Sequence, residues 1–129
     1  NENEVIGYET GLSALNRIGL VSQMPQKRCI ATNLHMKRIP KGMQIEIRKP
    51  PIRVNADNFR YLQILDAIRE LDMAPVDTAK PVDVVRATVQ KFALETDQMI
   101  LMARKYYGQK TLVRTIDIML EGSYESARG

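Results

Sequence analysis

The chain has 129 residues, of which 44% are hydrophobic and 26% charged, so it is long enough for one domain with its own core and unlike a disordered segment. No apolar run approaches the roughly 20 residues that span a bilayer, residues 1–9 are too acidic for a secretory signal, and a single cysteine cannot form an internal disulfide. We therefore expect one domain over residues 1–129 of an intracellular, cytoplasmic protein without a membrane segment. Because the numbering begins at Asn1 rather than at Met, we also expect that sequence precedes this chain.

The net charge of +4 is distributed unevenly. Residues 27–60 hold nine Lys and Arg against two Asp and Glu, an excess of +7, whereas the segments before and after them are slightly acidic. A polyanion or an acidic protein surface is the natural partner for such a block. A solvated sheet edge that Lys and Arg protect from aggregation is the alternative, and the charge pattern leaves both open.

The chain begins with a predicted short helix over residues 10–18. Leu12, Leu15 and Ile18 repeat every three residues and should share its buried face. Thr10 can cap the start of the helix, and Gly19 can adopt the left-handed turn at its end.

Two strands are predicted next, over residues 27–33 and 42–49. The second alternates best, with Met43, Ile45 and Ile47 on one face and polar residues on the other. Residues 34–42 can hold a further short strand and turn, and residues 52–54 a last short strand. Because a turn of hairpin length joins two of the strands, we expect a mostly antiparallel sheet with helices on one face.

Three helices complete the predicted fold. The first runs from a cap at Asn55 or Asp57 to about Leu71, and the second is a long helix over residues 82–107 that follows Pro81. The third spans roughly residues 109–121. The predicted fold class is α+β, with a short N-terminal helix, a small and mostly antiparallel basic sheet, and three C-terminal helices.

Residue types that carry catalysis or bind metals are sparse. The one histidine, His35, has no second ligand at zinc spacing, and no glycine-rich phosphate loop is present. We interpret Asp66 and Glu70, four residues apart, as a solvated helix face. Cys29 is most simply a small buried residue, and a Cys29–His35 pair is the remaining enzyme hypothesis. We expect no catalytic residue, no metal and no cofactor.

The basic block supplies the predicted binding face. It comprises Lys27, Arg28, Lys37, Arg38, Lys41, Arg48, Lys49 and Arg53. No aromatic residue lies between residues 27 and 58, so a stacking platform for single strands is not expected, and DNA would be contacted through its phosphates.

A second possible binding surface is the segment that contains Met99, Met102, Tyr106 and Tyr107. Methionine and tyrosine are adaptable contact residues at interfaces. We favour packing of these side chains in the protein's own core over a role in binding a partner or in forming a homo-oligomer.

Four short motifs follow one another near the start of the chain: a Ser-Ala-Leu helix, a Gly-Leu step, a Gln-x-Pro connector and a strand that ends in Thr-Asn. They are formed by Ser13, Ala14, Leu15, Gly19, Leu20, Gln23, Pro25, Ala31, Thr32 and Asn33. Together with the strand at Ile45–Arg48 and the step at Tyr107–Leu112, these motifs resemble the antitoxin domain of AbiEi-type proteins, the antitoxins of type IV abortive-infection toxin–antitoxin systems in bacteria.

The resemblance implies a non-enzymatic antitoxin and transcriptional regulator that counteracts a nucleotidyltransferase-like toxin. Such proteins usually carry an N-terminal winged helix, for which residues 1–9 are too few, so that domain's DNA recognition carries over to no residue here. The basic face would assist DNA binding through phosphates or would face the toxin or its nucleic-acid substrate. The alternatives are a general nucleic-acid-binding module and a protein-interaction domain. The latter would dimerise through the Met/Tyr helix, the predicted helical segment that contains Met99, Met102, Tyr106 and Tyr107.

Overall fold

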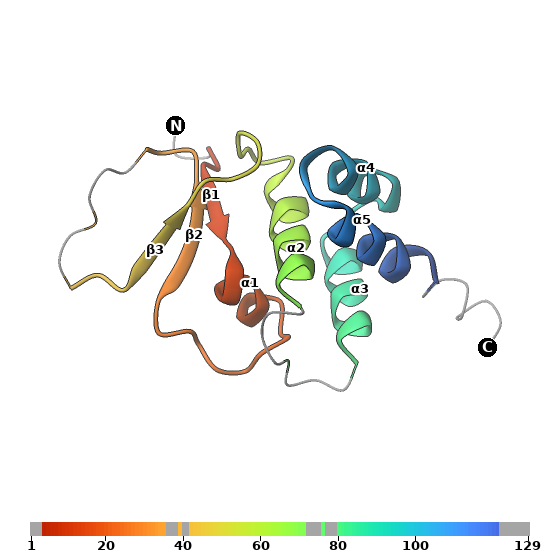
Figure 1. Ribbon diagram of the computed structural model, residues 1–129, viewed down its shortest axis with the longest axis horizontal. Helices are drawn as coiled ribbons and strands as arrows, with labels where there is room; N and C mark the ends of the chain where they lie inside the picture. The colour runs from red at the N-terminus through yellow and green to blue at the C-terminus, as the bar shows by residue number, and fades with distance from the viewer. Residues whose placement is uncertain (1–3, 36–38, 40–41, 72–75, 77–79, 122–129) are drawn as a thin grey trace.

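A computed structural model describes residues 4–35, 39, 42–71, 76 and 80–121. The strands lie at one end of the molecule, α1 lies next to them, and the remaining helices lie beyond (Figure 1). The elements are β1 (Gly7–Glu9), α1 (Gly11–Arg17), β2 (Arg28–Thr32), β3 (Ile45–Arg48), α2 (Phe59–Glu70), α3 (Pro81–Lys91), α4 (Thr96–Tyr106), α5 (Gln109–Ile116) and a π-helical turn (Asp117–Glu121). The predicted α+β class is confirmed. No helix in the described ranges is long and apolar enough to cross a membrane.

The sheet has the strand order β1-β2-β3. β1, which the sequence pattern did not predict, pairs antiparallel with β2. β2 and β3 are parallel, with Cys29 opposite Glu46 and Ile30 opposite Ile47. The expected antiparallel pairing of these two strands is therefore wrong. The connection over residues 33–44 is of the dozen-residue length that a parallel crossover needs.

The core lies between the sheet and the helices. It is centred on buried aliphatic side chains of α1 and α2, namely Ala14, Leu15, Leu62, Leu65 and Ile68. Leu15 and Ile18 are buried as predicted, but Leu12 is 44% exposed. Because the seven-residue α1 contacts both β2 and α2, Ser13 and Ala14 fill the buried positions instead.

The predicted helix over residues 82–107 is two helices, and Ala93 marks the break. α3 begins at Pro81, as expected, and ends where Ala93 adopts a left-handed φ of 53°. The N–H groups of Ala93 and Leu94 donate to the carbonyls of Gln90 and Val89, each at 3.0 Å, which closes the end of α3. The sequence pattern missed the break because residues 82–107 contain no Gly or Pro.

The starts of the other helices differ in detail from the predictions. Thr10 precedes α1, but its hydroxyl donates to Asp66 at 2.5 Å rather than capping the helix. The Asn55 side chain accepts the N–H groups of Asp57 and Asn58, each at 2.9 Å, in the turn that leads into α2. Residues 52–54 are not a strand, and the helix predicted over 109–121 ends as the π-helical turn.

Candidate interaction surface

The polar side chains of β3 lie on the side of the sheet that carries α1 and α2, and its isoleucines lie on the other side. Glu46 accepts a hydrogen bond from the Cys29 thiol at 3.0 Å, and Arg48 donates to Glu70 of α2 at 3.2 Å. Ile45 and Ile47 therefore point to the side of the sheet opposite α1 and α2. Both isoleucines are half-buried there, whereas Glu46 remains exposed on the helix side of the sheet.

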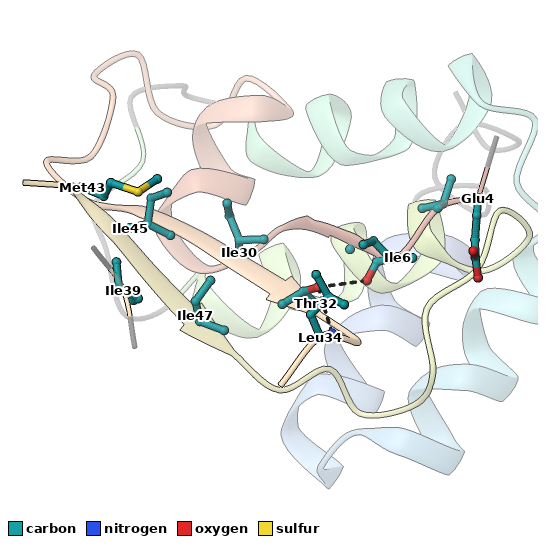
Figure 2. A pocket seen from close by; sticks show the side chains of 11 residues that line it. Glu4, Ile6, Ile30, Thr32, Leu34, Ile39, Met43, Ile45 and Ile47 are labelled. Atoms are coloured by element: carbon teal, nitrogen blue, oxygen red, sulfur yellow. Dashed lines mark hydrogen bonds between the residues drawn. The ribbon is translucent and has the colours of Figure 1, made fainter. Parts of the chain in front are cut away.

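Ile45 and Ile47 line an apolar hollow of about 450 Å³ on the side of the sheet away from α1 and α2 (Figure 2). We call it the isoleucine hollow, and its main apolar residues are Ile6, Ile30, Ile39, Met43, Ile45 and Ile47. Met43 at its rim is 50% exposed, and neighbouring Leu34 is 56% exposed. An apolar concavity of this size on a sheet is typical of a surface that another molecule covers.

All three described arginines of the predicted basic face have carboxylate partners. Arg28 donates from Nε to Glu9 at 2.9 Å, and Arg53 lies 3.9 Å from Glu4. Arg48 is half-buried between Glu46 and Glu70. The basic block therefore has less free positive charge than its composition suggests.

Two lysines of the predicted basic face, Lys27 and Lys49, are exposed and have no carboxylate within ion-pair distance among the described residues. Lys27 precedes β2 and Lys49 follows β3. Because these strands are parallel, the two ammonium groups lie toward opposite ends of the sheet. Lys37, Arg38 and Lys41 lie outside the described residues.

The guanidinium of Arg48 lies close to Gly11 at the start of α1. Gly11 has a φ of +58°, and a Cβ at this position would lie 3.1 Å from Nη1 of Arg48. A side chain on residue 11 would therefore strain the backbone and press against the guanidinium that links β3 to Glu70. Arg48 is a structural tie between the sheet and α2.

The Cys29 thiol is buried, as predicted, and its hydrogen bond goes to Glu46. Burial raises the pKa of the thiol, and the Glu46 carboxylate raises it further. The hydrogen bond from Cys29 and the charge of Arg48 lower the pKa of Glu46. A thiol with a raised pKa is a poor nucleophile, and His35 lies on an exposed loop.

Asp66 and Glu70 are buried, with exposed fractions of 2% and 8%, so their interpretation as a solvated face is wrong. Asp66 accepts hydrogen bonds from the hydroxyls of Tyr8 at 2.8 Å, of Thr10 at 2.5 Å, and of Tyr107. Burial and the adjacent Asp66 charge raise the pKa of both tyrosines. The cluster joins β1, α2 and the end of α4. No local sequence signal could have revealed it.

Met99 and Met102 pack inside the protein, with exposed fractions of 0% and 3%. Tyr107 is engaged with Asp66, and only Tyr106 of this group is substantially exposed, at 38%. The favoured interpretation of the Met/Tyr helix as a core element is therefore confirmed for three of its four residues.

Comparison with known proteins identifies no relative of this chain. No protein-family model, curated protein or solved structure matches it. Within the part of the chain that the structure describes, no cluster of three or more His, Cys, Asp or Glu side chains could hold a metal ion.

Proposed function

We propose that this chain is a cytoplasmic, non-enzymatic antitoxin and transcriptional-regulator domain that counteracts a nucleotidyltransferase-like toxin. The face of the sheet away from α1 and α2 would contact the toxin or the macromolecule on which the toxin acts. The observation that carries this proposal is the apolar hollow that Ile45 and Ile47 line on the side of the sheet away from α1 and α2. Covering these side chains with a partner removes apolar area from water and so favours association.

The residues that resemble the AbiEi-type antitoxin domain build the scaffold behind this face. Ser13 of α1 accepts the N–H of Cys29 at 2.8 Å, and Leu15 and Leu20 are fully buried. Asn33 accepts the N–H of Val54 at 2.7 Å and donates to its carbonyl at 2.8 Å. These contacts support the proposal because they hold α1 and the following loops against the sheet.

The exposed cations favour an acidic or phosphate-bearing partner. Lys27 and Lys49 are exposed around the sheet, and Arg53 is 78% exposed with only a 3.9 Å contact to Glu4. Such charges speed the association of oppositely charged molecules. The same three side chains favour general nucleic-acid binding as the second candidate function. In that case the domain would contact phosphates without reading much sequence.

Co-expression with the gene adjacent to the one that encodes this chain tests the proposal, and that gene alone should inhibit growth. The wild-type chain should restore growth, and the double variant I45E/I47E should not, because two carboxylates in the isoleucine hollow would oppose docking. The control is Val113→Glu, since Val113 on α5 is 46% exposed and distant in sequence from the sheet. Circular dichroism should show that all three proteins are folded.

Two outcomes would contradict the proposal. Full rescue by I45E/I47E would show that this face of the sheet is not used, and failure of the wild-type chain to rescue would remove the antitoxin function. Light scattering on the same proteins should show whether a second copy of the chain covers the face. A wild-type dimer that I45E/I47E converts to a monomer would assign the hollow to self-association instead.

A further inference from the structure

A second hollow, of about 400 Å³, lies where α1, α2 and α3 meet. We call it the basic hollow. Its lining comprises Arg17, Ile18, Arg60, Gln63, Thr88, Lys91 and Phe92. Three of these side chains are cationic and none is a carboxylate. The three cations come from the end of α1, the first turn of α2 and the end of α3, so only the folded chain brings them together.

Arg60 is held in place by two aromatic rings. Its guanidinium carbon lies 4.0 Å from the ring centre of Phe92 and 4.5 Å from that of Phe59. Within the described part of the chain, no carboxylate lies within ion-pair distance of Arg60. A planar cation fixed by stacking needs little reorganisation to bind an oxyanion.

Lys91 adds a second unneutralised charge. Its ammonium lies 5.5 Å from the ring centre of Phe92, and it too has no carboxylate partner among the described residues. Arg17 is 3.1 Å from Glu9, but the same carboxylate also binds Arg28. One acidic group is thus shared by two guanidinium groups, so the basic hollow keeps a positive excess.

We propose that the basic hollow binds the phosphate groups of a small phosphorylated ligand. Arginine can form paired hydrogen bonds with phosphate oxygens, and lysine supplies a point charge. The volume lies within the range of small-molecule sites. This site goes beyond the proposed function, because it lies away from the isoleucine hollow and uses none of the eight residues of the predicted basic face.

Thermal unfolding with sodium pyrophosphate, at constant ionic strength adjusted with sodium chloride, tests the inference. The wild-type chain should show a saturable rise in Tm, since a ligand that binds only the folded state stabilises it. Arg60→Met and Lys91→Met should each weaken binding at least tenfold, and Arg60→Lys should restore part of it. The control is Arg104→Met, on an exposed position of α4 outside the hollow.

Parallel titrations with orthophosphate and a nucleoside triphosphate distinguish the sources of the phosphate. A triphosphate that binds at least tenfold more tightly than pyrophosphate would identify a nucleotide, and equal binding would identify the phosphates alone. The site would be overturned if Arg104→Met and Lys91→Met weakened pyrophosphate binding equally. It would also be overturned if no small phosphate raised the Tm of the wild-type chain. A rise in Tm with duplex DNA but with no small phosphate would assign these cations to contacts with the nucleic-acid backbone, and it would also overturn the inference.

Discussion

The carboxylate of Asp66 accepts hydrogen bonds from the hydroxyl groups of Tyr8, Thr10 and Tyr107. These residues lie 58, 56 and 41 positions away in the chain. Arg69, one turn along α2, lies 3.6 Å from the carboxylate. A buried carboxylate is tolerated only when hydrogen bonds and opposite charge replace its lost hydration. The spacing of Asp66 and Glu70 on their own helix predicts a solvated face, because the residues that replace the water are remote in sequence.

Stability should fall at alkaline pH because of Tyr8 and Tyr107. Burial, followed by the charge of Asp66, raises the pKa of both phenols above that of an unfolded tyrosine, which is about 10. Above pH 10 the unfolded chain loses these protons and the folded chain keeps them. The free energy of unfolding should therefore keep its full value below about pH 10. Above that pH it should decrease, by up to about 1.4 kcal/mol per pH unit for each tyrosine.

Urea unfolding at pH 8, 10 and 11 measures this effect, and the variant Tyr107→Phe isolates it. Its alkaline loss of stability should be smaller than that of the wild type, since one of the two phenols is gone. Tyr106→Phe is the control, because Tyr106 is exposed and lies outside the Asp66 cluster. Identical profiles for all three proteins would contradict the assignment.

At the scale of the element, β3 and the break after α3 show what a local sequence pattern does not predict. The alternation of Ile45 and Ile47 with Glu46 and Arg48 correctly predicts a strand. It does not specify which face meets the helices, because Cys29 and Glu70 provide partners for the polar side chains across the sheet and on α2. Similarly, the continuous apolar pattern through Ala93 hides a turn that depends on a left-handed backbone.

Ala93→Gly should stabilise the protein by about 0.5–1 kcal/mol. A left-handed conformation costs an alanine roughly 1–2 kcal/mol, and glycine adopts it without a clash of Cβ, although glycine loses more backbone entropy on folding. Ala87→Gly is the matched control, since Ala87 is exposed within α3 and its replacement should destabilise by about 1 kcal/mol. Urea unfolding compares the two, and a loss of stability in both would contradict the left-handed turn.

At the scale of the whole molecule, the positive charge is redistributed by folding. Glu9, Glu46 and Glu70 neutralise arginines of the basic block, although two of these acids lie outside it in sequence. Arg17 and Lys91, which lie outside the block, meet Arg60 in the basic hollow. The location of the net positive potential thus depends on contacts between distant segments, and a count along the chain cannot give it.

If the domain contacts duplex DNA, exposed cations around the sheet should account for much of the salt dependence. The triple variant K27Q/K49Q/R53Q should reduce the slope of log Kobs against log salt by about 2–3, since each phosphate contact contributes about 0.9. The control R104Q/K105Q changes two exposed cations of α4 and should leave the slope unchanged. Fluorescence anisotropy at 50–200 mM salt measures both. An unchanged slope in the triple variant would exclude these side chains from DNA contact.

The α+β class, the two main strands, α1 and α2 follow from the sequence, because hydrophobic periodicity and turn residues act between near neighbours. Only the tertiary structure decides that β3 pairs in parallel, that its isoleucines lie on the side of the sheet away from α1 and α2, and that Asp66 is buried. It also assembles the basic hollow from residues 17, 60 and 91. These features depend on partners supplied by distant segments, so no pattern within a helix or strand encodes them.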